Sequence, residues 1–239
     1  MGDAKETLEC LADVAVLIPA AGKSLRYGSE GGAGSKLAEV VGGRSVLAWA
    51  VGAFLKRNDV GQVVIAAGDL VGARELLGEL AADGRVVVVR GGASRAESVR
   101  EAAAAADAVM TWVAVHDGAR PAVSQGLISR VFQAAREHGA AGPATPVILT
   151  IKQATGPLPA RVERTLPRQS LWAMQTPQVM RRADLLAAYE RCRLPLELVT
   201  DDLQLLELAG MGAVLVEGEE GNVKITHPGD LELVRGRLA

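Results

Sequence analysis

Three cationic side chains stand in a glycine-rich segment near the start of the chain, where packing alone cannot orient them. Residues 17–37 have the sequence LIPAAGKSLRYGSEGGAGSKL, which places Lys23, Arg26 and Lys36 after a short apolar run. Glycine-rich backbone can turn several N–H groups toward one point, and residues 20–22 are placed to do so. The pattern is typical of a loop that binds an anion, although a solvated basic loop would have the same composition.

A phosphate-binding P-loop is the first alternative to consider for this segment, and one position argues against it. The tripeptide GKS at 22–24 follows an apolar run, but the motif needs a further glycine five residues before its second glycine. Leu17 occupies that position. The tripeptide GSK at 34–36 fails as well, because the lysine of the motif must directly follow the glycine. A P-loop kinase is therefore disfavoured.

The segment GGASRAESV at 91–99 has both a structural and a chemical interpretation. Ser94 and Glu97 form the pattern of a capping box, which predicts that a helix begins here. The two glycines before them serve no capping purpose, but they let a backbone approach a flat ligand closely. Arg95 and Ser98 lie in the first turn of the predicted helix and would face the same rim as the glycines.

The segment VAVHDGARP at 113–121 supplies a carboxylate at the end of a predicted strand. Asp117 is well placed to hold Mg²⁺ near bound phosphates, since Mg²⁺ is usually held by one or two carboxylates together with substrate oxygens. Arg120 follows at once, so a plain ion pair at a turn is the alternative. His116 continues the strand and is expected to be packed or hydrogen-bonded rather than catalytic.

Short apolar runs alternate with helical patterns over the first 140 residues. We predict strands at 14–18, 62–67, 85–90 and 112–115, and helices at 45–56, 71–80, 94–106 and 127–137. Such alternation is typical of an α/β fold with a three-layer, mostly parallel, Rossmann-like sheet. Right-handed crossovers then bring the strand-to-helix loops to one edge, where ligands of such folds bind. The three segments above would meet at that edge.

The pattern changes after Pro143, where a hairpin with a proline-rich tip is predicted. We predict extended segments at 146–152, 161–166, 213–217 and 223–226, helices at 182–192 and 201–209, and a last helix from about Pro228. No stretch has the composition of a linker. The sequence therefore predicts a single domain over 1–239 with a protruding hairpin arm at about 146–166.

Composition excludes several classes of function. A net charge of -2 gives no broad basic surface for nucleic acid, and no apolar run approaches the length of a membrane span. Acidic residues precede the first apolar run, unlike a secretory signal. Cys10 and Cys192 are too isolated for a disulfide framework or a zinc site. A cytoplasmic protein that binds neither membranes nor nucleic acid is expected.

Three consecutive strand ends thus supply cations, a glycine-lined slot and one carboxylate. The sequence shows no Ser–His–Asp set, reactive cysteine or carboxylate pair to act as a nucleophile. Nucleotidyl transfer needs none, because its nucleophile is a phosphate oxygen of the acceptor. The protein has to align that oxygen with the α-phosphate, neutralise charge and release pyrophosphate.

The chain also resembles the 2-C-methyl-D-erythritol 4-phosphate cytidylyltransferases, enzymes of the non-mevalonate isoprenoid pathway. The resemblance covers nearly the whole chain through PAAGKSLR, GGASRAESV, HDGARP, WAMQTPQ, TDD and EGNVKIT, in that order. It implies a nucleotidyltransferase that uses CTP and methylerythritol phosphate together with Mg²⁺ or another divalent cation. It also implies a homodimer in which the hairpin arm is exchanged between subunits.

The resemblance assigns roles to individual residues of this chain. CTP would contact Ala20, Ala21, Gly22, Gly92, Arg95 and Ser98. Arg26 and Lys36 would be the catalytic pair that stabilises the α-phosphate during transfer, and Asp117 would be the metal ligand. The acceptor would contact Arg120, Thr150, Arg168, Thr176, Thr200 and Lys224, with Arg168 reaching in from the partner subunit.

The chain departs from the family pattern at a few positions. Ser24 replaces a usual glycine, the tripeptide at 35–37 replaces Pro-Lys-Gln, and Leu149 replaces an aspartate near the acceptor contacts. Two rival functions therefore stay open at this point. One is a cytidylyltransferase for another polyol phosphate, such as ribitol 5-phosphate. The other is a nucleotide-binding regulatory protein that has lost catalysis.

Overall fold

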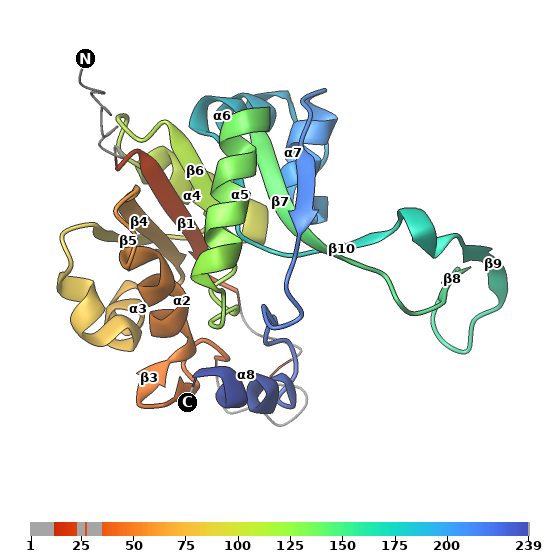
Figure 1. Cartoon of the computed structure of the whole chain (residues 1–239), viewed down its shortest axis with the longest axis horizontal. Helices are drawn as coiled ribbons and strands as arrows, with labels where there is room; N and C mark the ends of the chain where they lie inside the picture. The colour runs from red at the N-terminus through yellow and green to blue at the C-terminus, as the bar shows by residue number, and fades with distance from the viewer. Residues whose placement is uncertain (1–11, 23–26, 28–34, 239) are drawn as a thin grey trace, which may run out of the picture.

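The chain folds around a mixed, mostly parallel sheet, shown in Figure 1 as a computed structural model that describes residues 12–22, 27 and 35–238. Four neighbouring strands are parallel, in the spatial order β6 (Trp112–Val115), β1 (Val14–Ala20), β4 (Val60–Ala67) and β5 (Val86–Arg90). These strands and their parallel pairing confirm the prediction for the first half of the chain.

The remaining strands of this sheet are β7 (Ala140–Pro146), β10 (Trp172–Met174), β11 (Gln178–Arg181) and β12 (Val214–Glu217). β11 lies antiparallel beside both β6 and β7, β10 is antiparallel to β7, and β12 is parallel to it. The sequence analysis did not predict β7, whose sequence AAGPATP contains a single β-branched residue. Burial between neighbouring strands, rather than intrinsic propensity, makes this segment a strand.

Helices cover both faces of the sheet and complete the three predicted layers. One apolar cluster contains residues of α2 (Val46–Leu55), α3 (Leu70–Leu77), α5 (Gln125–His138) and α8 (Asp230–Leu238). The other contains residues of α4 (Arg95–Ala105), α6 (Arg182–Arg191) and α7 (Asp202–Leu208). Among the described residues, no helix is long and apolar enough to cross a lipid bilayer.

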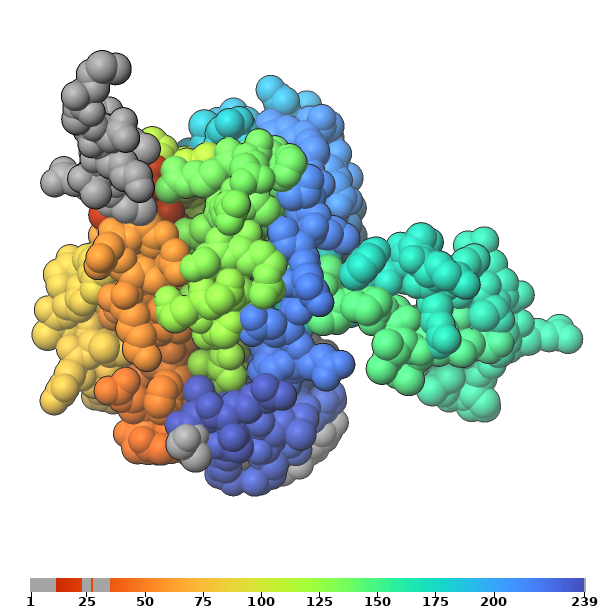
Figure 2. Space-filling model, viewed as in Figure 1, coloured from red at the N-terminus to blue at the C-terminus, as the bar shows by residue number. Residues whose placement is uncertain are grey.

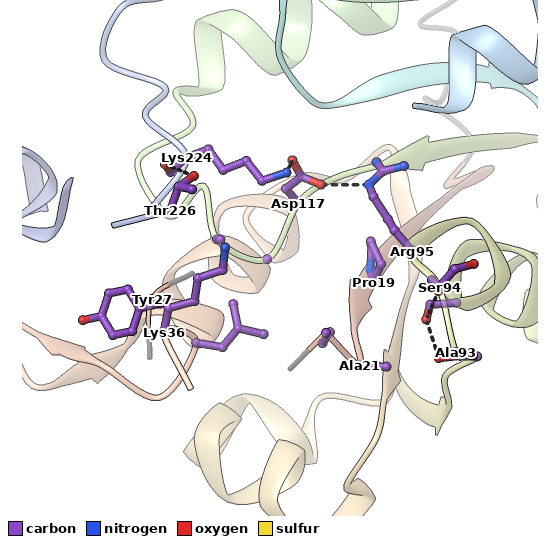
Figure 3. Close-up of a pocket in the computed structure, with 17 residues that line it drawn as sticks. Pro19, Ala21, Tyr27, Lys36, Ala93, Ser94, Arg95, Asp117, Lys224 and Thr226 are labelled. Atoms are coloured by element: carbon purple, nitrogen blue, oxygen red, sulfur yellow. Dashed lines mark hydrogen bonds and ion pairs between the residues drawn. The ribbon is translucent and has the colours of Figure 1, made fainter. Parts of the chain in front are cut away.

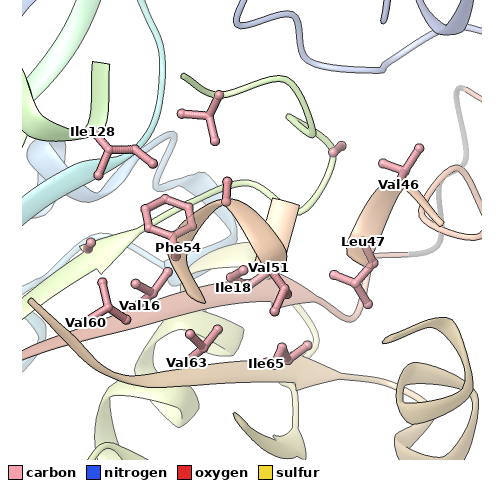
Figure 4. Packing of buried hydrophobic residues seen from close by; sticks show 14 of the residues in the cluster. Val16, Ile18, Val46, Leu47, Val51, Phe54, Val60, Val63, Ile65 and Ile128 are labelled. Carbon is pink, nitrogen blue, oxygen red and sulfur yellow. The ribbon is translucent and has the colours of Figure 1, made fainter. Parts of the chain in front are cut away.

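The central strand β1 supplies both clusters because successive side chains of a strand point to opposite faces. Val16 and Ile18 belong to the cluster under α2, whereas Leu17 belongs to the cluster under α4. Figure 4 shows the first pair beside Val51 and Phe54 of α2. All three strand side chains are fully buried. The end of β1 is therefore held rigidly, and the loop that follows it has a fixed starting point.

Helix starts agree with the sequence pattern. Ser94 accepts a hydrogen bond from the Glu97 N–H while the Glu97 carboxylate accepts one from the Ser94 N–H, which confirms the capping box. Ser45 and Ser124 cap α2 and α5 through their side-chain oxygens. Asp201 caps α7 through its side chain, which accepts from the Gln204 N–H. The caps fix where the first turns of these helices lie relative to the sheet edge.

The segment predicted to be extended at 223–226 belongs to no strand of the sheet. The Ile225 N–H donates to the Ala119 carbonyl at 2.9 Å, and the Ile225 side chain is fully buried. The alternation in VKIT thus reflects one buried side chain rather than a hydrogen-bonded ladder. α8 follows at Asp230, whose carboxylate accepts from the N–H groups of Thr226 and His227 at 2.8 Å.

The hairpin arm extends away from the rest of the molecule, as Figures 1 and 2 show. It is formed by the antiparallel strands β8 (Ile151–Ala154) and β9 (Val162–Leu166). Its first strand begins later than predicted because Pro146 still belongs to β7. Ile148, Leu149 and Leu158 are more than 70% exposed on this arm. A two-stranded hairpin is marginally stable alone, so these apolar side chains indicate that the arm packs against something.

The smaller elements lie at the periphery. They are the hairpin of β2 (Val40–Val41) and β3 (Arg44–Ser45) and the 3₁₀ helices η1 (Gly78–Ala82), η2 (Arg168–Ser170) and η3 (Leu196–Leu198).

Candidate active site

Two adjoining pockets open at the carboxyl ends of β1 and β6, the edge that the topology predicts. The first pocket is a cavity of about 420 Å³, and the second is a cavity of about 240 Å³. Both pockets are lined by Arg95, Asp117 and Lys224, so these three charged residues stand between them. A reaction between two bound molecules would take place at this boundary.

The first pocket is formed mainly by loops that follow strands. Figure 3 shows Lys36 on one side of this pocket and Arg95 with Ser94 on the other, with Ala21, which directly follows β1, below Arg95 in this view. Of the predicted site residues it contains Ala20, Ala21, Gly22, Lys36, Gly92, Arg95, Ser98, Asp117 and Lys224. Nine predicted residues from separate parts of the chain are thus brought together in one cavity.

The second pocket collects most of the predicted acceptor residues. It is lined by Arg95, Asp117, Arg120, Thr176, Thr200 and Lys224, together with Met174, Gln175, Gln178 and Asp201. Thr150 and Arg168 lie on the arm and line neither pocket of their own chain. The Arg168 guanidinium donates instead to the Ile148 carbonyl. Arg26 falls outside the described residues, as do Lys23 and Ser24.

Asp117 is surrounded by cations at the boundary of the two pockets. Its Oδ1 lies 3.2 Å from Arg95 Nε, and its Oδ2 lies 2.8 Å from Lys224 Nζ and 3.6 Å from Arg120 Nε. Burial raises the pKa of this carboxyl, but the charges of Arg95, Lys224 and Arg120 outweigh it and hold the pKa well below its usual range. The three neighbouring cations therefore favour the anionic form of Asp117.

Arg95 is held from its far side by a residue to which the sequence analysis assigned no role. Its Nη2 lies 2.8 Å from Asp202 Oδ2 at the start of α7, and the Asp202 side chain is buried. Burial raises the pKa of Asp202, and the charge of Arg95 opposes that shift. Asp202 Oδ1 has no hydrogen-bond partner among the described residues. The Arg95 guanidinium is thus held between the carboxyl groups of Asp202 and Asp117.

The glycines at 91 and 92 are required by close packing around the first pocket. A Cβ atom on Gly91 would lie 2.6 Å from the Cβ of Ala21, and one on Gly92 would lie 2.3 Å from the Cβ of Glu97. Ser98 Oγ donates to the Ser94 carbonyl at 2.9 Å, so its hydroxyl is already engaged within α4. The small residues therefore bring the end of β1 and the start of α4 against each other along the wall of the pocket.

A buried chain of hydrogen bonds fixes the loop that carries Asp117. The Asp117 N–H donates to Thr176 Oγ1, and Thr176 donates to His116 Nδ1, each at 3.1 Å. His116 Nε2 donates to the Arg120 carbonyl at 3.1 Å, because a carbonyl only accepts. Burial lowers the pKa of His116 to about 4, which keeps the ring neutral. His116 is thus packed and hydrogen-bonded, as the sequence suggested.

Two further polar residues, also missed from the sequence, complete this network. Arg120 Nη1 donates to the Asn222 carbonyl at 2.7 Å, and Asn222 Nδ2 donates to the Thr176 carbonyl at 2.8 Å. Gln178 Oε1 accepts from the Asp202 N–H at 2.9 Å. Asn222 and Gln178 lie within motifs noted in the sequence, EGNVKIT and WAMQTPQ, which were the available signal. Their partners are distant in sequence, so only the fold identifies what they hold.

The residues present do not form a metal centre by themselves. No group of three or more His, Cys, Asp or Glu side chains gathers in the described part of the chain. Asp117 is the only carboxylate among the described residues that line the first pocket, and both of its oxygens face cations. A divalent cation fits here only if phosphate oxygens supply most of its ligands.

Comparison with known proteins agrees with this geometry. The sequence matches the family described as 2-C-methyl-D-erythritol 4-phosphate cytidylyltransferase (IspD) over residues 14–238. The chain belongs to this family. The family member from Thermus thermophilus is 40% identical over 221 residues, covering 92% of this chain and 95% of the relative. The one from Solibacter usitatus is 38% identical over 227 residues, covering 92% and 93%.

Solved structures of cytidylyltransferases in this family have the same fold. The crystal structure from Francisella tularensis has a TM-score of 0.80 at 29% identity and covers 95% of this chain and 100% of its own. The crystal structure from Thermus thermophilus has a TM-score of 0.72 at 36% identity, covering 94% and 98%. The α/β fold predicted from the sequence is therefore confirmed.

Proposed function

We propose that this protein transfers the cytidylyl group of CTP to 2-C-methyl-D-erythritol 4-phosphate in the two adjoining pockets. Membership of the family supports both substrates. The observation that carries the proposal is the shared boundary of Arg95, Asp117 and Lys224, where a phosphate in each pocket would meet. An oxygen of the acceptor phosphate attacks the α-phosphorus of CTP, the bond from that phosphorus to the β-phosphate oxygen breaks, and pyrophosphate leaves.

The first pocket suits the nucleotide. Backbone at residues 20–22 and the close approach at Gly91 and Gly92 give a narrow slot with few side chains in the way. Lys36 stands opposite the slot, where it would bind the α-phosphate. Lys36, with Arg26 supplied by the family resemblance, would bind the transition state more tightly than bound CTP. Only such differential binding accelerates the transfer itself.

The second pocket suits the sugar phosphate. Arg120 and Lys224 bring positive charge, and Thr176 and Thr200 bring hydroxyl groups for phosphate and diol oxygens. Arg120 is 9% exposed and fixed by the Asn222 carbonyl, so its guanidinium is oriented before the acceptor arrives. Such prior orientation lowers the entropic cost of binding the acceptor in line with the α-phosphate.

Binding of both substrates would rearrange the ion pairs of Asp117. Phosphate oxygens carry more negative charge than one carboxylate, so they compete for Lys224 from the second pocket and for Arg95 from the first. Arg95 keeps its bond to Asp202 throughout and so stays at the boundary. Asp117 is then released from one or both cations. The cations would then face the phosphates of the substrates instead of Asp117, and the chain would not need to move far.

The dependence on magnesium is part of the proposal. A divalent cation bound with the triphosphate supplies charge neutralisation of the departing pyrophosphate. Asp117, once released by Lys224, is the residue of this chain that would contact it. Equilibrium binding of CTP should tighten with added Mg²⁺ in the wild type and respond less in Asp117→Asn. An equal response in both proteins would remove Asp117 from this role.

We also propose that the protein works as a homodimer that exchanges its arms. Arg168 and Thr150 line neither pocket of their own chain, and the arm exposes Ile148 and Leu149. A mixing experiment tests this arrangement. Lys36→Ala and Arg168→Ala proteins, each inactive alone, should recover about a quarter of wild-type turnover after mixing and reassociation, since half of the dimers are mixed and each has one intact site. No recovery would mean that Arg168 serves its own chain.

Release of pyrophosphate tests the reaction itself. We expect turnover with CTP and methylerythritol phosphate to exceed turnover with ATP, GTP or UTP, and with ribitol 5-phosphate as acceptor. Faster turnover with ribitol 5-phosphate would mean that the proposed acceptor is wrong, while the proposed nucleotide site would stand. CTP binding without pyrophosphate release under any acceptor would overturn the proposed catalysis.

A further inference from the structure

A third pocket lies away from the active site, where the C-terminal helix meets α2. It is a cavity of about 430 Å³ between α2, residues 121–125 at the start of α5, residues 219–221 and the end of α8. In Figure 2 the dark blue C-terminal segment lies against the orange segment that carries α2 and β3. None of its described lining residues lines the first or the second pocket. We call it the C-terminal pocket.

The C-terminal pocket carries an excess of positive charge. Arg44, Lys56 and Arg237 line it, and none of the three forms a salt bridge with a described carboxylate. Glu219 is the one described carboxylate in its lining. That carboxylate accepts from Ser124 Oγ at 2.9 Å and lies 3.6 Å from Arg130 outside the pocket. Within the described part of the chain, the three cations therefore have no paired counter-charge.

Apolar side chains form part of the remaining lining, beside Ser124 and Gln125. Trp49, Pro121 and Val123 contribute to the lining, and the Arg44 guanidinium lies 5.4 Å from the centre of the Trp49 ring. A Cβ atom at position 221 would lie 2.3 Å from Arg237 Nη1, so glycine there leaves room for the guanidinium against the backbone. A ligand that fits would combine a strongly negative group with an apolar part.

The segments that line this pocket are joined in sequence to residues that line or support the second pocket. Pro121 follows Arg120, and Gly221 precedes Asn222, whose carbonyl accepts from Arg120. Glu219 and Gln175 also exchange two backbone-to-side-chain hydrogen bonds, at 2.8 and 3.1 Å. Any movement of residues 219–221 toward a ligand would act on the bonds that orient Arg120.

We propose that the C-terminal pocket binds a phosphate-bearing small molecule with an apolar part, and that its occupancy changes the KM for the acceptor. The expected ligand class follows from three uncompensated cations beside Trp49 and Pro121. The effect on the acceptor follows from the segments shared with Arg120, and binding at the two sites must then be linked reciprocally. This effect rests on the function proposed above, whereas the binding itself does not.

Calorimetric titration with phenyl phosphate tests the binding. The wild type should bind it, and Lys56→Ala/Arg237→Ala should lose about tenfold or more in affinity, since two charge-assisted contacts are removed. The control Arg191→Ala/Arg193→Ala, which removes two exposed cations on and just after α6, should bind like the wild type. Inorganic phosphate should bind more weakly than phenyl phosphate. Equal affinity in the wild type and the Lys56/Arg237 variant would overturn the site.

A kinetic titration tests the coupling. In the wild type and in the Arg191/Arg193 control, phenyl phosphate should change the KM for the acceptor by at least about twofold. In Lys56→Ala/Arg237→Ala, the KM should stay at its value without phenyl phosphate, and the KM for CTP should match the wild type. Competition at the active site would appear equally in all three proteins. An equal change in all three would therefore overturn the coupling, while the titration above still reports on the binding.

Discussion

The two pockets of the active site are built in opposite ways. The first is bounded largely by small residues and backbone, including Ala21 and the glycine at 92. The second is bounded by polar side chains that already bond to neighbouring groups, such as Thr176 and Arg120. In the proposed function, the first pocket would bind the nucleotide by letting the backbone approach it closely. The second pocket would bind the acceptor by holding charge and hydroxyl groups in place beforehand.

This difference has a consequence for substitutions. A substitution at a first-pocket side chain that would contact the α-phosphate, such as Lys36, should act mainly on catalysis or on CTP binding. A change in the second pocket breaks bonds present in the empty protein. It should therefore disturb the acceptor site and the stability of the fold together.

Lys36→Ala should have the largest effect and leave the fold intact. Removing one preorganised cation from the developing charge should lower kcat about 10²–10³-fold. The measurement is pyrophosphate release at saturating substrates, with Arg191→Ala, an exposed cation outside both pockets, as the control. A Lys36→Ala protein with near-normal kcat would show that the first pocket does not bind the transition state through this residue.

Acid should destabilise the second-pocket network through His116. The pKa of this ring is lowered by burial from 6.5 to about 4 in the folded protein. The unfolded chain therefore binds more protons between these values, and stability falls as pH drops from 6.5 toward 4. The loss should approach about 3 kcal/mol in the free energy of unfolding. Urea unfolding at several pH values measures it.

A matched pair of variants tests whether His116 causes this pH dependence. His116→Asn should lose most of the slope between pH 6.5 and 4, at the cost of lower stability at pH 7. His138→Asn, at an exposed ring at the end of α5, should keep the slope. A His116→Asn protein that keeps the wild-type slope would assign the titration to another group.

Asp202→Asn tests whether a buried anchor positions Arg95 for the first pocket. Loss of a charged hydrogen bond of this kind costs about 2 kcal/mol, which corresponds to about thirtyfold in kcat/KM for CTP. Asp201→Asn is the control, because asparagine caps a helix as well as aspartate and the contact to Arg95 is kept. Equal kcat/KM values for the two variants would remove the anchoring role.

Thr176→Val should have the smallest kinetic effect, which should fall on the acceptor rather than on CTP. The change leaves the Asp117 N–H and His116 Nδ1 without partners while keeping the shape of the side chain. We expect the KM for methylerythritol phosphate to rise about tenfold. The KM for CTP should stay the same, and Thr176→Ser should restore the acceptor KM. A rise in the CTP KM instead would mean that the pockets are not separate.

The same contrast explains how much the sequence could predict. Lys36 and Asp117 were expected to meet because parallel strands end at one edge, and Ser94 with Glu97 was a local pattern. These features need only nearby residues or a general rule of topology. Nine of the residues that line the first pocket were named from the sequence, most of them through the family resemblance.

The second pocket could not be derived in the same way. Asp202, Gln178 and Asn222 act through partners many residues away, so no local pattern reveals what they hold. The strand at 140–146 was missed because its propensity is low. The segment at 223–226 shows a strand-like alternation that comes from one buried side chain, and it joins no strand. Tertiary packing decides both cases.

A crystal structure with CTP bound tests the central claim most directly. The account predicts the triphosphate in the first pocket, along residues 20–22, with Lys36 Nζ in contact with an α-phosphate oxygen and Arg95 still bonded to Asp202. The second pocket should stay open for the acceptor. A triphosphate in the second pocket, or Lys36 turned away from the nucleotide, would contradict the account.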